Sequence, residues 1–271
     1  MQFRATLVWY ASRVFLHLDY FMTVAQRALA WVQHEVLWRI SSEHTRFAVN
    51  QRLYQMEQEY YPGSDFFNDQ LFDWEKTLLE MEAFPKHGRL LLLAAGAGRE
   101  VQALADLGYE IVCLEPNPSF YAAAAAHFSE RQTVHWVRAS FADVSTEWRR
   151  TGDPSELSRS FDAVWIGWGA LSYLHTEAEQ RNLLSTLRRN NPRAPIVMSF
   201  LMQTPVTGAG SRFRDRWLGK SVGASRVFFR RSGFTYLYTQ EQIVRLADDT
   251  SYEIKTFRMQ PYPHALFVPK S

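Results

Sequence analysis

An apolar run followed by two glycines constrains the fold of this 271-residue chain most strongly. Residues 90–94 are Leu-Leu-Leu-Leu-Ala, a pattern typical of a strand buried on both faces, as in parallel sheets. Gly96 and Gly98 follow directly, and apolar residues at helical spacing come next. A second apolar strand, residues 111–114, ends at the single acid Glu115. The pattern predicts one βαβ unit with glycines in its first turn and a carboxylate after its second strand.

Such a unit suits the binding of a nucleoside. Bare backbone at Gly96 and Gly98 lets a ligand approach the end of the first strand closely. The following helix presents free N–H groups and the positive end of its dipole. Glu115, nineteen positions after Gly96, is spaced to accept hydrogen bonds from the two hydroxyls of a ribose. We therefore expect an adenosine-containing cofactor.

The glycine pattern discriminates between cofactors. A dinucleotide fingerprint requires a third glycine where Val101 stands, which disfavours an NAD-dependent oxidoreductase. No Gly-Lys-Ser/Thr follows, so a P-loop is excluded. Residues 89–117 instead resemble motif I of the class I S-adenosylmethionine-dependent methyltransferases, which have a Rossmann-like fold.

This resemblance extends over residues 85–271, because further family landmarks appear in order. Residues 161–175 look like the fourth strand and its active-site loop, residues 195–200 like the fifth strand, and residues 252–268 like the closing strand pair. The resemblance implies an α/β fold. Its sheet would be seven-stranded, doubly wound and mostly parallel, with an antiparallel C-terminal strand pair.

The resemblance also implies S-adenosylmethionine as the cofactor and a set of residues beside it. These are Ala95, Gly96, Ala97, Gly98, Glu115, Pro116, Asn117, Ser140, Phe141, Gly167 and Trp168. Either Ser140 or Asp143 would meet the exocyclic amine of adenine, and Phe141 would stack on its ring. Asp143 is equally interpreted as a cap of the next helix.

Two positions depart from the family pattern. Ala94 stands where an acid usually helps to hold the methionine amino group, and Glu100 replaces the third motif glycine. Together they keep a non-catalytic binding or interaction protein as the alternative function. Glu100, in the first turn of the helix, is an alternative source of the missing negative charge.

The acceptor side is expected in the loop after the fourth strand and in the amino-terminal helices. His175 is the best candidate for a general base because its unperturbed pKa lies near 6.5. Tyr173 is a second candidate catalytic residue and a candidate pocket residue. The alternative for His175 is a capping or packing role. By resemblance, Tyr60, Tyr61 and Phe66 are candidate lid and substrate-binding residues, with core packing as the alternative.

Residues 203–233 form a basic insertion with seven basic residues against one acid. Arg212 and Arg214 in this insertion suggest an anionic acceptor, and a solvated surface loop is the alternative. The net charge of +2 gives no overall nucleic-acid signature. Methyl transfer from a sulfonium needs alignment more than a catalytic constellation. We therefore expect O- or N-methylation of a small molecule.

Residues 1–84 read as an all-helical extension that precedes a methyltransferase domain at 85–271. Within residues 1–40 an apolar stripe recurs at steps of three and four: Leu7, Ala11, Val14, Leu18, Phe21, Ala25, Leu29, Val32 and Val36. The stripe predicts a helix that packs on the catalytic domain or on a second copy of the chain, as in a homodimer. Contact with a membrane surface is the alternative, and the scarcity of lysine counts against it. Further helices are expected from Ser41–Ser42 to Met56 and from Ser64 to Met81.

Cysteine and histidine usage bounds the remaining chemistry. The single cysteine, Cys113, lies in the expected second strand and is interpreted as a buried apolar residue. No disulfide can form within the chain, which fits a reducing cytoplasm. The eight histidines are scattered and form no cluster with cysteine, so no metal site is expected.

Overall fold

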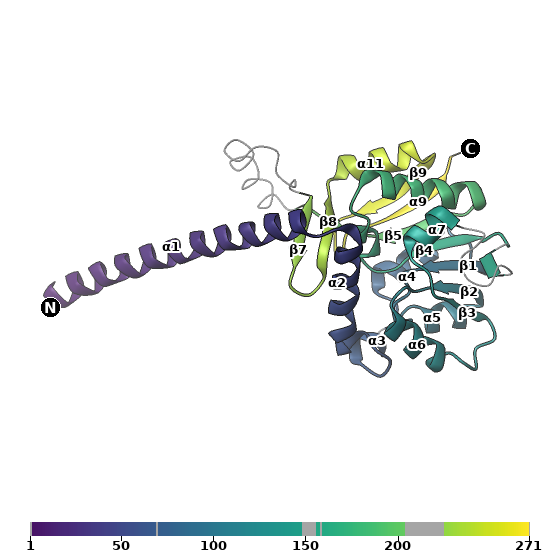
Figure 1. The fold of residues 1–271 in the computed structure, drawn as a ribbon, viewed down its shortest axis with the longest axis horizontal. Helices are drawn as coiled ribbons and strands as arrows, with labels where there is room; N and C mark the ends of the chain where they lie inside the picture. Colours follow the sequence, from purple (N-terminus) through teal and green to yellow (C-terminus); the bar gives the residue numbers. More distant parts are fainter. Residues whose placement is uncertain (1, 69, 148–155, 158, 204–224, 271) are drawn as a thin grey trace.

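The computed structural model describes residues 2–68, 70–147, 156–157, 159–203 and 225–270 (Figure 1). Its strands are β1 Gly88–Leu93, β2 Tyr109–Leu114, β3 Val134–Val137, β4 Ala163–Ile166, β5 Ile196–Ser199, β6 Leu201–Met202, β7 Arg226–Phe229, β8 Gly233–Tyr238, β9 Tyr252–Arg258 and β10 His264–Pro269. Its helices are α1 Gln2–Ile40, α2 Glu43–Met56, η1 Gln58–Tyr60, α3 Asp65–Asn68, α4 Asp73–Glu80, α5 Val101–Asp106, α6 Pro118–His127, α7 Phe141–Glu147, η2 Ala170–Tyr173, α9 Glu177–Asn190 and α11 Gln240–Asp249.

Seven strands form the central sheet in the order β3-β2-β1-β4-β5-β10-β9. The first five pair in parallel, whereas β10 runs antiparallel to both β5 and β9. This order confirms the predicted mostly parallel sheet with an antiparallel C-terminal strand pair. The carboxyl ends of the central strands β1, β2 and β4 meet at one edge, which is where ligands bind in open α/β sheets.

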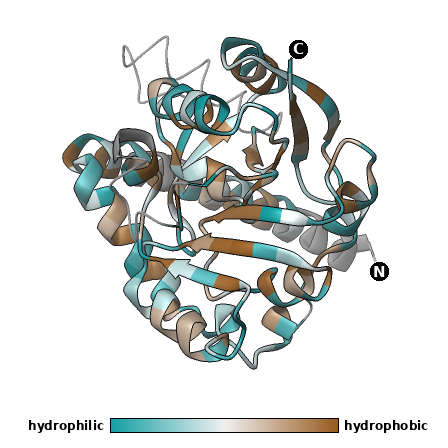
Figure 2. Ribbon diagram, turned by 90° about the vertical axis from the view of Figure 1, so that its right-hand side faces the viewer, coloured by the Kyte–Doolittle hydropathy of each residue, from teal (hydrophilic) through white to brown (hydrophobic). Residues whose placement is uncertain are grey.

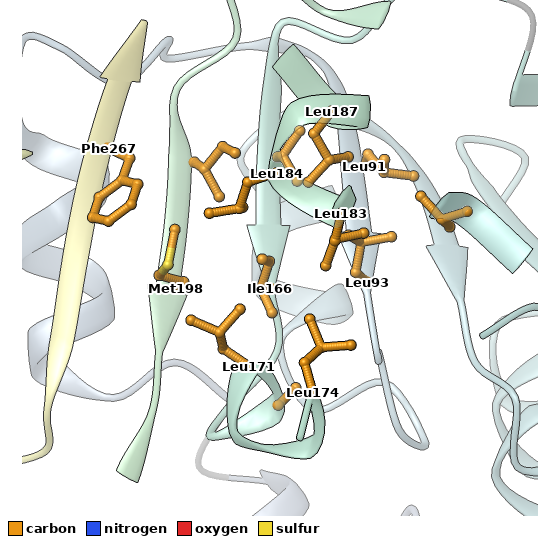
Figure 3. Close-up of a cluster of buried hydrophobic side chains, with 14 of the residues drawn as sticks. Leu91, Leu93, Ile166, Leu171, Leu174, Leu183, Leu184, Leu187, Met198 and Phe267 are labelled. Carbon is orange, nitrogen blue, oxygen red and sulfur yellow. The ribbon is translucent and has the colours of Figure 1, made fainter. Parts of the chain in front are cut away.

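Side chains of β1 alternate between two apolar layers because successive residues of a strand point to opposite faces. Leu91 and Leu93 pack with α7, α9 and α11, and Figure 3 shows this layer around Leu183, Leu184 and Leu187 of α9. On the other face, β1 packs against α3, α4, α5 and α6. Hydrophobic colouring is concentrated on the central strands in Figure 2. The sheet is therefore covered on both sides, as a doubly wound fold requires.

The prediction of one continuous helix over residues 64–81 is wrong. The structure contains α3 and α4 instead, separated by residues that include Gln70 with a φ of +54°. A new helix start follows, because the side chain of Glu75 accepts a hydrogen bond from the backbone N–H of Phe72 at 2.7 Å. The apolar spacing that predicted one helix is produced by two short ones facing the same core.

The amino-terminal helices differ in how they meet the body. The predicted cap of α2 is confirmed: the backbone N–H of Thr45 donates to Oγ of Ser42 at 3.1 Å. The division into residues 1–84 and 85–271 stays a prediction, although α3 and α4 share one apolar core with the sheet. Helix α1 projects away from the body over most of its length (Figure 1). Within the described residues no helix combines the length and apolarity needed to cross a membrane.

A second, small sheet with the order β6-β8-β7 lies beside the main one and was not expected from the sequence. Strands β7 and β8 pair antiparallel, and they include the last part of the predicted basic insertion. Arg212 and Arg214 lie outside the described residues. The end of α1 docks on this sheet, since Nδ1 of His34 accepts a hydrogen bond from the backbone N–H of Phe228 at 2.9 Å.

Candidate active site

A cavity of about 770 Å³ lies at the carboxyl ends of β1 and β2, beneath helix α2. Its volume is within the roughly 300–1,000 Å³ of small-molecule and cofactor sites. The lining comes from the turn after β1, from the loops after β2, β3 and β4, from α2 with the segment that follows it, and from α9. Within the described structure, the edge that the sequence assigned to a nucleoside is therefore hollow.

The two glycines after β1 have different roles. Gly96 has a φ of +58° and lines the cavity, and apart from its two chain neighbours no residue has an atom within 4 Å of where its Cβ would stand. Gly98 has a φ of +97°, and a Cβ there would meet Cε2 of Phe128 at 2.6 Å. Gly96 thus leaves room on the ligand side, whereas Gly98 allows the turn to pack against the protein itself.

Glu115 is buried at the cavity, 5% exposed. One carboxylate oxygen accepts a hydrogen bond from the backbone N–H of Gly96 at 2.8 Å, and the other accepts from Asn117 at 2.7 Å. Burial raises the pKa of Glu115 to about 7, against the lowering effect of these two bonds. Because each carboxylate oxygen can accept two hydrogen bonds, acceptor capacity remains for ligand hydroxyls.

Asn117 fixes the loop after β2. Its side-chain oxygen accepts from the backbone N–H of Ser119 at 3.0 Å and so caps α6. Its side-chain amide donates to the carbonyl oxygen of Gln51 at 3.0 Å, which attaches the loop to α2. The loop that carries Glu115 is thereby held against the helix that roofs the cavity.

On the expected adenine side, Ser140 and Phe141 line the cavity. The carboxylate of Asp143 accepts from both the backbone N–H and the hydroxyl of Ser140 at 2.7 Å. This is a capping arrangement at the start of α7, in line with the alternative interpretation of Asp143. Asp143 is not among the described lining residues.

A buried ion-pair cluster borders the turn after β1. The guanidinium of Arg99 donates to both carboxylate oxygens of Glu75, at 2.9 and 2.7 Å, and to Glu100 at 2.6 Å. All three side chains are less than a tenth exposed, and Arg99 and Glu100 line the cavity. Burial raises the pKa of Glu75 to about 7, and the neighbouring Glu100 adds to the rise against the guanidinium. Two carboxylates around one guanidinium leave this wall electronegative when both are ionised.

Aromatic side chains form the wall after β4. Trp168 lines the cavity and contacts Phe66, Phe72 and Tyr262, with ring centroids 5.2 to 5.7 Å apart. The backbone at Gly167 is closely packed, because a Cβ there would meet the carbonyl oxygen of Ala94 at 2.4 Å. The absence of a side chain at Gly167 therefore allows the end of β4 to lie close to the end of β1. Trp168 presents an apolar surface to a ligand.

Tyr173 is joined to a residue that sequence reasoning missed. Its hydroxyl is hydrogen-bonded to the hydroxyl of Tyr54 on α2, and both residues line the cavity. Burial raises the pKa of both phenols, so neither is an effective base near neutral pH. Tyr60 packs against Tyr54 and also lines the cavity. The signal for Tyr54 was its helical spacing with Phe47 and Gln51 on one face of α2.

His175 lines the cavity but is also used by the fold. Its Nε2 lies 3.0 Å from the carbonyl oxygen of Phe234, and its ring packs edge-on against Trp38. Burial lowers the pKa of His175, so the imidazole is neutral near pH 7. Its role as general base stays a prediction, and its contact with β8 fits the packing alternative.

Phe234 also anchors α2. The side chain of Asn50 accepts from the backbone N–H of Phe234 at 2.7 Å and donates to its carbonyl oxygen at 2.8 Å. Asn50 is buried and lines the cavity, and it was not singled out from the sequence. These two bonds join the roof helix to the small sheet.

The structure does not bring every candidate into the lining. Three candidates do not line the cavity as the structure describes it: Gly98, Gly167 and Tyr61. Four further candidates do line it: Ala95, Ala97, Pro116 and Phe66. Tyr61 packs on Phe120 instead. Two acids that were not expected, Glu43 and Glu179, line the side beneath α2. Repulsion from Glu179 raises the pKa of Glu43.

Cys113 is buried within β2, as expected, and burial raises its pKa.

In the described part of the chain one group, Glu110, His135 and Glu156, brings three potential metal-ligand atoms within 4.8 Å of one another. Arg89 donates to Glu110 at 2.8 Å and to Glu156 at 2.6 Å. Arg159 also donates to Glu110, at 2.8 Å, so two guanidinium groups balance the two carboxylates. The group is therefore an ion-pair cluster, and it is not part of the cavity lining.

Comparison with solved structures identifies the fold as that of the class I S-adenosylmethionine-dependent methyltransferases. A protein from Pyrococcus horikoshii has a TM-score of 0.57 and 18% identity, covering 81% of this chain and 99% of its own. A SAM-dependent methyltransferase from Methanosarcina mazei has a TM-score of 0.54 and 14% identity, with 74% and 99% covered.

A third solved structure is 1,6-didemethyltoxoflavin-N1-methyltransferase from Burkholderia thailandensis, with its substrate and S-adenosylhomocysteine bound. It has a TM-score of 0.55 and 13% identity, covering 86% of this chain and 92% of its own. No protein-family model matches the sequence, and no curated protein matches it. At sequence identities of 13% to 18%, structural similarity establishes the fold. The resemblance seen in the sequence is therefore confirmed at the level of the fold.

Proposed function

We propose that this chain is an S-adenosylmethionine-dependent methyltransferase that O- or N-methylates a small molecule. The observation that carries the proposal is the carboxylate of Glu115, which faces a hollow cavity beside Gly96 in a methyltransferase fold. A pair of ribose hydroxyls donating to this carboxylate would place the nucleoside across the ends of β1 and β2. Ser140 and Phe141 would then border the base.

The described residues fit this cofactor. The space beside Gly96 is open, and Glu115 retains acceptor capacity. S-adenosylmethionine supplies an activated methyl group, whose transfer breaks the carbon–sulfur bond and leaves a neutral thioether. The protein therefore has to align the acceptor and exclude water. Trp168, Tyr60 and Phe66 are suited to excluding water, because they surround the expected transfer point with aromatic surface.

The family pattern has an acid at the position of Ala94. Glu100 is our candidate for the residue that supplies this negative charge instead. Its carboxylate lies in the cavity wall and shares the guanidinium of Arg99 with Glu75. With two acids around one base, this wall favours a cation, and the methionine end of the cofactor carries an ammonium group. We propose that Glu100 binds this ammonium group.

The acceptor is proposed to lie beneath α2, between Tyr54, Tyr173 and His175. A small-molecule acceptor is supported by the cavity volume and by the Burkholderia enzyme, which holds 1,6-didemethyltoxoflavin. An anionic acceptor depends on Arg212 and Arg214, outside the described residues. The described acceptor side instead contributes tyrosines and the acids Glu43 and Glu179, which favours an aromatic or amine-bearing acceptor.

Thermal unfolding with S-adenosylmethionine, S-adenosylhomocysteine and NAD tests the proposal. A ligand at 100 times its dissociation constant stabilises the folded state by about 2.7 kcal/mol. We expect both sulfur ligands to raise the unfolding temperature and NAD to leave it unchanged. Stabilisation by NAD alone would indicate an oxidoreductase. No response to any of the three would indicate a non-catalytic interaction protein.

A further inference from the structure

Helix α1 carries a long apolar face that the body of the protein leaves uncovered. Among the described side chains of residues 12–40, eleven large apolar ones are 44% to 75% exposed. They are Val14, Phe15, Leu16, Leu18, Tyr20, Phe21, Met22, Val24, Leu29, Val36 and Ile40. Figure 1 shows the helix extending away from the sheet and its covering helices. Packing on the catalytic domain, one of the two expected arrangements, therefore applies only to the last turns of α1.

The apolar face points away from the body. Docking uses His34, which bonds to β7, and Trp38, which is buried against His175 and Phe234. At about 100° per residue, these two side chains point roughly 160° and 200° around the helix from Val36. Val36 and Ile40 are exposed even though they lie beside the docking residues. A partner can therefore cover the face along its whole length without meeting the body of the same chain.

The spacing of this face fits a second helix of the same kind. From Leu7 to Val32 apolar residues alternate in steps of four and three, at positions 7, 11, 14, 18, 21, 25, 28 and 32. No polar residue interrupts this series over more than three heptads. A repeat of 3.5 residues keeps a seam facing a partner helix, as in coiled coils.

The area of the face matches what a stable dimer needs. Eight of the exposed side chains share the apolar stripe: Val14, Phe15, Leu18, Phe21, Met22, Leu29, Val36 and Ile40. At these exposures each side chain leaves on the order of 100 Å² of apolar surface accessible to solvent, or roughly 800 Å² per chain. A standard interface buries about 800 Å² per partner, whereas the largest apolar patch of a monomer is about 300–600 Å².

The charges of α1 argue against a lipid surface as the occupant. Residues 2–40 contain four arginines and no lysine, against Asp19 and Glu35. Arg39 is paired with Glu35 at 2.7 Å. Helices that lie on membranes carry a polar face rich in Lys and Arg. We infer that α1 is a self-association element, through which two copies of this chain pair by the apolar stripe of α1.

Light scattering coupled to size exclusion tests this inference on the full chain at micromolar concentration. The wild type is expected at twice the mass of the chain. The double variant Leu18→Glu, Phe21→Glu places two charges in the stripe and is expected at the monomer mass, because its seam can no longer be desolvated. The matched control Ser12→Glu, Thr23→Glu adds the same charge on the polar side of the helix and is expected to remain a dimer.

Two further measurements make the outcome decisive. The thermal unfolding midpoint of the body is expected to be the same in both double variants, which separates lost association from lost folding. Sedimentation with vesicles of phosphatidylglycerol and phosphatidylcholine tests the lipid alternative. A wild-type monomer would overturn the inference, whether or not it binds vesicles. A stripe variant that remains dimeric would also overturn it.

Discussion

The carboxylate of Glu115 and the backbone N–H of Gly96 are joined by a hydrogen bond of 2.8 Å between the ends of β2 and β1. The bond holds a buried acid beside the open side of the glycine turn. It leaves the carboxylate within the cavity, where it can accept further hydrogen bonds from a ligand. The function proposed above depends on this pair.

The first prediction concerns Glu115 itself. Replacing Glu115 with Ala is expected to weaken S-adenosylhomocysteine binding by roughly 1–3 kcal/mol, because charge-assisted hydrogen bonds to the ribose are lost. Isothermal titration calorimetry measures the change. The control is Glu110→Ala, which removes an acid from the opposite end of the same strand and should leave the affinity unchanged. Equal affinities in all three proteins would refute the ribose assignment.

The second prediction concerns pH. Ribose hydroxyls donate to the ionised form of Glu115, whose pKa is raised to about 7 by burial. Binding therefore favours loss of the proton, and affinity for S-adenosylhomocysteine should rise roughly tenfold between about pH 6 and pH 8. The Glu115→Gln variant should show no such rise. A rise that persists in this variant would point to Glu75, whose pKa is also raised to about 7.

The third prediction tests the assignment of Glu100. The change Glu100→Gln should weaken S-adenosylhomocysteine binding about tenfold, since a charged partner of the ammonium is lost. It should leave the binding of 5′-methylthioadenosine unchanged, because that ligand has the nucleoside and the thioether but no amino acid end. Equal losses for both ligands would instead indicate a general distortion of the turn after β1.

The fourth prediction separates the two glycines. Gly98→Ala should lower the free energy of unfolding by about 1–3 kcal/mol, because its Cβ would overlap Phe128 and its φ is positive. Gly96→Ala should lower it by only about 1 kcal/mol but should weaken ligand binding, since its Cβ would stand in the open side of the cavity. Denaturant unfolding and calorimetry measure the two effects. Identical behaviour of the two variants would contradict the division of roles.

The fifth prediction concerns the anchor of the roof helix. Asn50→Leu should destabilise the protein by about 2–4 kcal/mol, because the buried N–H and carbonyl oxygen of Phe234 lose a partner. The exposed neighbour Arg52→Leu is the control and should change stability little. Thermal unfolding measures both. A small effect of Asn50→Leu would show that α2 is held chiefly by its apolar contacts.

The parts that could be predicted from the sequence are those specified within one βαβ unit. The apolar run of β1, the glycine turn and Glu115 lie within 30 residues, and periodicity and spacing are local signals. The mostly parallel sheet with its antiparallel C-terminal strand pair followed from the family resemblance. The turn at Gln70 was missed because α3 and α4 together imitate the spacing of one helix.

The roof of the cavity could not be predicted because its contacts are distant in sequence. Asn50 bonds to Phe234 across 184 positions, and Tyr54 meets Tyr173 across 119. No pattern within α2 specifies these partners. Strands β6, β7 and β8 were missed for a related reason. Glycines and basic residues around them indicated a loop, and β7 and β8 are hydrogen-bonded to α1 and α2, which are distant in sequence.

A crystal structure of the protein with S-adenosylhomocysteine would show whether Glu115 binds the ribose. We expect the ribose hydroxyls to lie within hydrogen-bonding distance of the Glu115 carboxylate oxygens, with the thioether next to the backbone after β1. A ligand bound elsewhere, or a Glu115 carboxylate that makes no contact with the ribose, would contradict the account.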